Sequence, residues 1–397
     1  MTELLNYSSI FRRVDWDFGD FSSRNFKSDI NTLHWYPASF VPQIPDVLIQ
    51  TLSREGDCVA DMFAGSGITL IEAAKLGRKF IGVDISPFAV EIAKAKFLAI
   101  ELASTDWQDD LSQKISSSRI GEPARDYVER LGIDPEVFKW FEEKTLDELL
   151  SIHEVVASKH KNRFLLEKVL FSSILCKCSS QRRHYTYITD GCFPKDFVYK
   201  PAKNFFVEKV TLTNMGAQIF REQYRRRHSK EYGYDGDIRL ADARSLSWIK
   251  EPSIDLVVTS PPYLGTHDYL KAMRLTNLFF PEKNFKSYLE NEIGARCKRH
   301  KKNAYEEYLN DMKEAFQEIH RVLKPGGFMG MTIGRGKGKV IKFDILGQLL
   351  DFLTAKGDFV TVYESSRKIS SRRIRFPGVM MERIIVLRKS DKEEFHN

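Results

Sequence analysis

The chain has 397 residues, of which 42% are hydrophobic and 29% charged, so it can bury one large core or two smaller ones and is not mainly disordered. It contains no run of about eighteen apolar residues that could span a membrane, and its first residues carry charges where a signal peptide is apolar. Five cysteines, an odd number scattered over a long chain, indicate reduced thiols. We expect a cytoplasmic protein without a membrane partner.

The formal net charge of +7 is unevenly distributed. Segment 176–230 holds twelve Lys and Arg against four Asp and Glu, a net charge of +8, and two shorter basic runs follow at 296–302 and 367–375. A polyanionic partner such as nucleic acid would explain this clustering, and a solvated surface would explain it equally well.

Strand and helix patterns alternate near the amino terminus. After helical spacing of apolar residues over 40–52, residues 58–63 have the pattern of a buried strand that leads into a glycine-containing turn. A helix is expected over 68–76, a strand over 80–84, and a second helix over 87–98 with Ser86 as its N-cap. This alternation predicts a parallel sheet covered by its crossover helices.

From about residue 100 the pattern is helical. Asp134-Pro135 predicts one helix start, and Thr145 with Glu148 predicts a capping box for the next. Strand patterns return at 238–241, 254–259, 328–333, 359–363 and 383–387, with a helix over 305–322. The simplest division is an arm (1–33), a cofactor-binding half (34–99), a helical and basic insertion (100–232) and a catalytic half (233–397).

Gly65 and Gly67 stand between a strand and a helix, where glycine allows a positive φ and brings backbone amides close to a ligand. Asp84 ends the next strand, at the place where a carboxylate can accept hydrogen bonds from both hydroxyls of a ribose. No Gly-Lys-Ser/Thr run follows the turn, which argues against a phosphate-binding loop. We therefore expect an adenosine-containing ligand.

The run Asp61-Met-Phe-Ala-Gly-Ser-Gly67, followed by Phe80-Ile-Gly-Val-Asp84, resembles the cofactor signature of the S-adenosylmethionine-dependent amino-methyltransferases of DNA. His34-Trp-Tyr-Pro-Ala-Ser-Phe40 is similar to the family segment that lies against the methionine end of the cofactor. The resemblance implies a doubly wound, Rossmann-like α/β sheet of class I methyltransferases, mostly parallel with an antiparallel last strand. It assigns the following residues to S-adenosylmethionine: Tyr36, Pro37, Phe40, Asp61, Phe63, Ala64, Gly65, Ser66, Gly67, Thr69, Asp84, Ile85 and Asp242.

Ser260-Pro261-Pro262-Tyr263 directly follows an apolar strand. Two consecutive prolines fix φ and remove two amide donors, so the flanking side chains are held rigidly at the carboxyl edge of the sheet, where ligands of open α/β sheets bind. We expect these four residues to be catalytic: acceptors such as the Ser260 hydroxyl and the Pro261 carbonyl can hydrogen-bond an exocyclic amine of a base and direct its lone pair at a methyl donor, so displacement would be direct. The ring of Tyr263 is expected to stack on a base that has left the double helix.

In the family that the chain resembles, Thr-Ser-Pro-Pro-Tyr goes mostly with cytosine N4, and Asn or Asp before Pro-Pro-Tyr goes mostly with adenine N6. Thr259-Ser260 therefore favours cytosine N4, with adenine N6 as the alternative. Methylation at cytosine C5 needs a nucleophilic thiolate, usually in a Pro-Cys pair, and no cysteine of this chain follows a proline. An RNA base methyltransferase and a non-catalytic nucleic-acid-binding protein are less favoured alternatives.

DNA is the expected partner, with a cognate restriction endonuclease as a candidate second partner. The insertion is the candidate target-recognition region, although its first part could instead form a lid or an oligomer surface. Cys176, Cys178, His184 and Cys192 have poor spacing for a structural zinc site, so no metal is expected. The predicted substrate-binding residues are Thr259, His267, Asp268, Tyr269, Arg182, Arg183, Arg225, Arg226, Arg227, Arg372 and Arg373.

Overall fold

The computed structural model describes residues 2–18, 29–39, 41–158, 162–181, 193–334, 344–355, 357–368 and 381–391. Among these residues the helices are α1 (Thr2–Phe11), α2 (Gln43–Leu52), α3 (Ile68–Lys75), α4 (Pro87–Leu102), α5 (Trp107–Ser117), α6 (Ala124–Leu131), α7 (Glu143–Ala157), α8 (Phe164–Cys178), α9 (Ala202–His228), α10 (Arg274–Phe279), α11 (Phe285–Asn291), α12 (Ala304–Val322) and α13 (Ile345–Thr354). Short 3-10 turns are η1 (Ile30–Thr32), η2 (Pro135–Lys139), η3 (Lys271–Met273) and η4 (Arg296–His300). None of these helices is both long and apolar enough to cross a membrane.

Seven strands form one mixed sheet in the order β3-β2-β1-β4-β5-β7-β6. Their bounds are β1 (Cys58–Asp61), β2 (Lys79–Asp84), β3 (Gly236–Leu240), β4 (Ile254–Thr259), β5 (Leu323–Gly334), β6 (Phe359–Lys368) and β7 (Met381–Lys389). Strands β1 to β5 are parallel to one another, and β7 runs antiparallel to both β5 and β6. The predicted α/β sheet with an antiparallel last strand is therefore confirmed.

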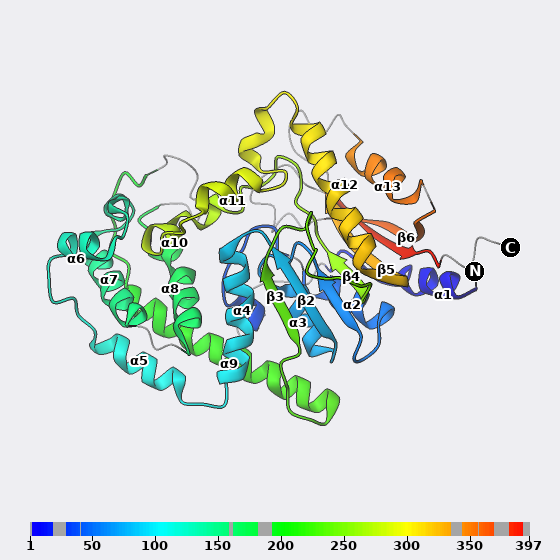
Figure 1. Cartoon of the computed structure of the whole chain (residues 1–397). Helices are drawn as coiled ribbons and strands as arrows, with labels where there is room; N and C mark the ends of the chain where they lie inside the picture. Colours follow the sequence, from blue (N-terminus) through cyan, green and yellow to red (C-terminus); the bar gives the residue numbers. More distant parts are fainter. Residues whose placement is uncertain are drawn as a thin grey trace.

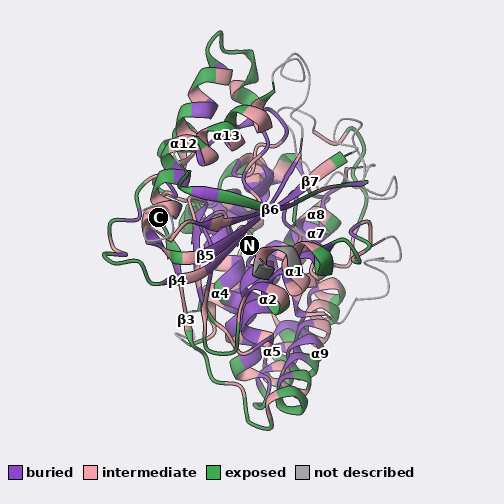
Figure 2. Cartoon of the chain, turned by 90° about the vertical axis from the view of Figure 1, so that its right-hand side faces the viewer, coloured by how far each residue is buried: buried purple, intermediate pink, exposed green. Residues whose placement is uncertain are grey.

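Both faces of the sheet are covered, which is why its strands are apolar on both sides. Along β7, Ile384 and Val386 belong to one hydrophobic cluster while Ile385 and Leu387 belong to the other. The first cluster includes side chains of α1 to α4, and the second includes side chains of α12 and α13. Figure 2 shows the resulting pattern, with buried strands at the centre and exposed residues on the outer helices.

Helices α5 to α9 form a helical array beside the sheet (Figure 1). Helix α4 joins the array to the sheet, because it packs against α8 and α9 on one side and against β2 and β3 on the other. Buried residues of the array, such as Trp140 and Phe171, belong to the same hydrophobic cluster as Leu48 of α2 and Leu256 of β4. The segment expected to be an insertion thus shares its core with the cofactor-binding half.

The chain crosses from the array back to the sheet at β3, so the two predicted halves lie side by side. Strand β1 pairs with β2 on one side and with β4 on the other. The carboxyl ends of β1, β2 and β4 consequently meet at one edge, and the loops that follow these strands carry the predicted site residues.

Candidate active site

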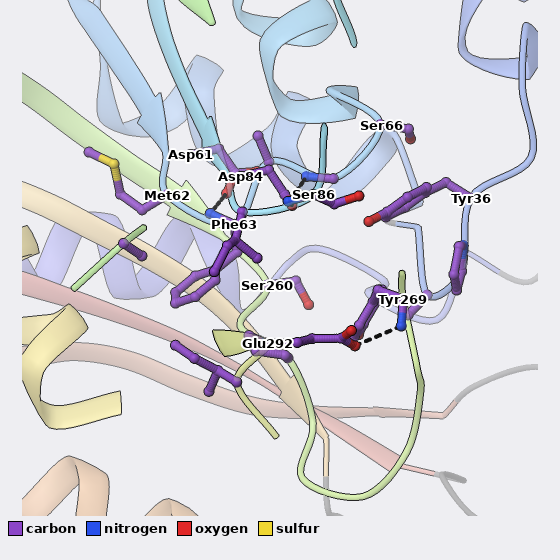
Figure 3. Close-up of a pocket in the computed structure, with 18 of the residues that line it drawn as sticks. Tyr36, Asp61, Met62, Phe63, Ser66, Asp84, Ser86, Ser260, Tyr269 and Glu292 are labelled. Carbon is purple, nitrogen blue, oxygen red and sulfur yellow. Dashed lines mark hydrogen bonds between the residues drawn. The ribbon is translucent and has the colours of Figure 1, made fainter. Parts of the chain in front are cut away.

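A cavity of about 850 Å³, its solvent-filled mouth included, lies at the carboxyl ends of β1, β2 and β4. Figure 3 shows side chains from the glycine turn, from the loop after β2 and from the loop after β4 around it. The glycine turn and the double-proline loop therefore face the same space, as predicted. The lining residues are Tyr36, Pro37, Ala38, Ser39, Asp61, Met62, Phe63, Ala64, Gly65, Ser66, Ile68, Asp84, Ile85, Ser86, Asp242, Ala243, Ser260, Pro262, Tyr269, Leu270, Glu292 and Ile293.

Asp61 is the buried anchor of the cavity floor. Its carboxylate accepts hydrogen bonds from the Thr69 hydroxyl (2.7 Å), from the Phe63 amide (3.1 Å) and from the Thr259 hydroxyl (2.6 Å). Burial raises the pKa of Asp61 to about 6, although these three donors act to lower it. Asp61 thus joins the end of β1 to the end of β4 and to the first turn of α3.

The glycine turn depends on its two positive φ angles. Gly65 has φ +50° and Gly67 has φ +78°. A Cβ at Gly67 would lie 2.8 Å from the Cβ of Ala93, and a Cβ at Gly65 would lie 3.2 Å from the Tyr36 ring. Both positions therefore require glycine for conformation and for space. Neither Gly67 nor Thr69 lines the cavity, so both act by shaping the turn.

Asp84 lies at the end of β2 and is half-buried. One carboxylate oxygen accepts from the Gly65 amide and the other from the Ser86 amide, each at 2.8 Å. Its burial in the cavity wall raises its pKa to about 6, and the two amide donors act in the opposite direction. Each carboxylate oxygen retains a lone pair for a further donor, such as a ligand hydroxyl.

Two aromatic rings form the opposite wall. Tyr36 and Tyr269 are stacked, with centroids 6.1 Å apart and planes at 26°. Asp242 also lines the cavity, but its carboxylate is bound by Arg244, at 2.6 Å between charged atoms. The predicted contact at Phe40 lies outside the described residues.

Ser260 faces the cavity from the loop after β4. Its hydroxyl donates to the Thr332 carbonyl oxygen at 3.0 Å, which leaves the lone pairs of Oγ available as acceptors. The hydroxyl of Tyr263 lies 3.4 Å from Ser260 Oγ and donates to Glu382 at 3.0 Å. The Pro262 carbonyl accepts from Tyr308 at 2.9 Å. Tyr263 and Pro261 are buried and do not line this cavity, so the structure does not place the Tyr263 ring where it could stack on a base in the cavity, as was expected.

Glu292 is a lining residue that no sequence pattern indicated. It is 3% exposed, and its two oxygens accept from the backbone amides of Tyr269 (2.7 Å) and Leu270 (3.4 Å). Burial raises its pKa to about 7, against the effect of these amides. Its partners are more than twenty positions away in the chain, so a single sequence gives no signal that links them.

Several predicted substrate contacts have other roles. Thr259 is fully buried and donates to Asp61, so it lies beneath the cavity and does not fit contact with a base. The Asp268 carboxylate accepts from the Cys297 amide at 2.8 Å, and the centroid of the His267 ring lies 5.6 Å from that of the Tyr269 ring. Only Tyr269 of this group lines the cavity. Arg182, Arg183, Arg372 and Arg373 lie outside the described residues.

Arg225, Arg226 and Arg227 lie at the amino edge of the sheet, opposite the cavity, and so cannot contact a base held there. The adjoining His228 bonds the Lys75 carbonyl and contacts Glu55, and both of these residues precede a strand at its amino end. Arg225 and Arg226 pair with Glu222, and Arg227 donates to Gln50. All three arginine side chains therefore have a partner within the protein.

Comparison with known proteins agrees with this geometry. The family model described as DNA methylase, of N6- and N4-methyltransferases, matches residues 6–95 and 254–397, which is more than half of the chain. The Type II methyltransferase M.MjaII of Methanocaldococcus jannaschii is 21% identical, over 96% of this chain and 84% of its own length. The Type II methyltransferase M.MvaI of Kocuria varians is 23% identical, over 89% of this chain and 87% of its own. The chain belongs to the DNA methylase family, whose methyl donor is S-adenosylmethionine.

Proposed function

We propose that this chain transfers a methyl group from S-adenosylmethionine to the exocyclic N4 amine of cytosine in DNA, as the modification enzyme of a restriction–modification system. The observation that carries the proposal is the hydrogen bonding of the Ser260 hydroxyl. Its hydrogen is directed to Thr332 and its oxygen lines the cavity, so it can accept a hydrogen bond from an amine.

The cavity suits the cofactor on three counts. Its volume is sufficient for a nucleoside with an amino-acid chain. The Asp84 oxygens offer acceptors for ribose hydroxyls, and the rings of Tyr36 and Phe63 offer apolar walls. The carboxylates of buried Asp61 and half-buried Asp84 would favour a ligand that carries positive charge. S-adenosylmethionine supplies an electrophilic methyl group on a sulfonium.

Ser260 is the proposed catalytic residue. The amine of cytosine is a weak nucleophile because its lone pair is delocalised into the ring. An acceptor that binds an amine hydrogen weakens this delocalisation and orients the nitrogen. The Ser260 hydroxyl is held in place by its hydrogen bond to the Thr332 carbonyl oxygen. The neighbouring Tyr263 hydroxyl, 3.4 Å away, is held by Glu382.

The target base must leave the double helix to reach a cavity of this kind. The rings of Tyr269 and Phe63 line the cavity and are candidates for stacking on the base, an interaction that contributes about 1–3 kcal/mol. Cytosine is proposed over adenine because Thr259-Ser260-Pro261-Pro262-Tyr263 resembles the cytosine-N4 members of the family. The two relatives are named as Type II methyltransferases, which supports a cognate endonuclease as a partner.

One experiment tests the base assignment. DNA is incubated with the protein and with isotope-labelled S-adenosylmethionine, digested to nucleosides and analysed by mass spectrometry. The proposal expects labelled 4-methylcytosine. Labelled 6-methyladenine would overturn the choice of base, and label in RNA but not in DNA would overturn the choice of nucleic acid.

A further inference from the structure

The basic segment 296–302 (Arg-Cys-Lys-Arg-His-Lys-Lys) contains five Lys and Arg and no acid. It comprises η4 and the two residues after it. Arg299 and Lys302 are exposed, and Arg296 is half-buried. The segment lies outside the helical array, which holds most of the excess positive charge. Its charge therefore belongs to a different part of the surface.

The backbone of the basic segment is fixed to the loop that follows the catalytic serine. The Arg296 amide donates to the His267 carbonyl at 2.9 Å, and the Cys297 amide donates to the Asp268 carboxylate at 2.8 Å. Just upstream, the Gly265 amide donates to the Gly294 carbonyl at 2.8 Å. These bonds hold the segment at the same edge of the sheet as the cavity.

The charges of this segment are only partly used within the protein. The Lys298 ammonium donates to the carbonyls of Glu290 and Glu292, and Lys301 pairs with Glu307 at 3.2 Å. Within the part of the chain that the structure describes, Arg296, Arg299 and Lys302 have no carboxylate in an ion pair. By contrast, Arg225 and Arg226 at the opposite edge share Glu222.

We propose that Arg296, Arg299 and Lys302 bind backbone phosphates of the DNA that flank the base held in the cavity. The proposal rests on the proposed function, because it names the surface that holds the same substrate. Cations on phosphates set the position of a protein on DNA without reading its sequence, so this surface would present any target to the cavity. Recognition of particular bases would come from elsewhere.

The test compares two triple variants that remove equal charge. The first is Arg296→Ala/Arg299→Ala/Lys302→Ala, and the matched control is Arg225→Ala/Arg226→Ala/Arg227→Ala. Affinity for a mixed-sequence DNA duplex is measured as a function of salt concentration. Each phosphate contact contributes about 0.9 to the slope of log affinity against log salt, so the first variant should lower the slope by about 2.7 and the control by less than about 0.9.

The affinity of the first variant for S-adenosylmethionine, measured by calorimetry, should be unchanged. This control would show that the cavity is intact. The single changes Arg299→Ala and Lys302→Ala affect exposed side chains and should each lower the slope by about 0.9. An unchanged slope in the triple and single variants, with wild-type DNA binding intact, would overturn this inference alone. Equal loss in both triple variants would also overturn it, and a wild-type chain that binds no DNA would overturn it together with the proposed function.

Discussion

The Thr259 hydroxyl donates a hydrogen bond of 2.6 Å to the Asp61 carboxylate, across 198 positions of the chain. Thr259 ends β4 and Asp61 ends β1, and both side chains are buried. The bond therefore joins the strand that leads to the glycine turn with the strand that leads to Ser260. Two segments that the helical array separates in sequence are fixed together directly beneath the cavity.

Replacing Thr259 with Val should lower the free energy of unfolding by about 1–3 kcal/mol. The change keeps the shape of the side chain but leaves a buried carboxylate oxygen with one donor fewer. Urea denaturation followed by circular dichroism measures the effect, and Thr259→Ser, which keeps the hydroxyl, is the control. A Val variant as stable as the wild type would show that the bond contributes nothing to the fold.

Replacing Ser260 with Ala should lower kcat by about 10²–10³-fold, a size typical for the loss of one preorganised hydrogen-bonding group. Affinity for S-adenosylmethionine should stay unchanged, because the hydroxyl is assigned to the amine. Ser247→Ala, at an exposed serine, is the matched control. Single-turnover methylation and calorimetry separate the two effects, and normal turnover of the Ala variant would refute the role of Ser260.

Affinity for S-adenosylmethionine should depend on pH through Asp84. Burial raises the pKa of this carboxyl to about 6, so it becomes protonated as the pH falls through 6 and loses acceptor capacity. Affinity should therefore rise between about pH 5 and about pH 7 and then level off. Calorimetry across this range tests the expectation with Asp84→Asn as the control, and an Asn variant with the wild-type profile would assign the titration to another group.

The raised pKa of Asp84 should also make the stability of the ligand-free chain depend on pH, but in the opposite direction: stability falls as the pH rises. The pKa of Asp84 in the folded chain, about 6, lies above its ordinary value of 3.8. The stabilisation linked to protonation is complete below the ordinary pKa and is lost as the pH rises through 6. Between pH 3.8 and about pH 6, the stability of the wild type should therefore fall relative to that of Asp84→Asn. Thermal denaturation at several pH values measures this difference.

Glu292→Gln should remove a pH dependence of the reaction. The Glu292 carboxylate accepts from two backbone amides, whereas Gln offers one acceptor oxygen. Because burial raises the pKa of Glu292 to about 7, wild-type kcat/KM should rise with pH through 7 as the carboxylate ionises. The Gln variant should be slower and should lack this rise. The expectation assumes that the ionised Glu292 carboxylate positions Tyr269 through its backbone amide. A rise that persists in the Gln variant would contradict this role.

Local patterns in the sequence were sufficient for most individual elements. The N-cap at Ser86 is present, with its hydroxyl accepting from the Ala89 amide, because this bond forms within one turn. The predicted capping box was wrong. Helix α7 begins at Glu143, and the Glu142 carboxylate accepts from the Thr145 amide, while Thr145 and Glu148 bind the amides of Lys200 and Lys203. A local rule failed there because a distant segment satisfied the same side chains.

The sequence by itself determined the parallel part of the α/β sheet, the two positive-φ glycines, the position of Asp84 at the end of β2 and the placement of Ser260 at the carboxyl edge, since each follows from residues close in the chain. Only the tertiary structure decided that Thr259 supports the site from below, that Glu292 lines it, and that Arg225–227 stand at the far edge while the basic segment stands at the near one. The physical reason is that charged and hydrogen-bonding groups pair with groups that are close in the folded structure but distant in the sequence. Whether a basic run is neutralised within the protein or left for a ligand depends on which carboxylates the fold brings beside it.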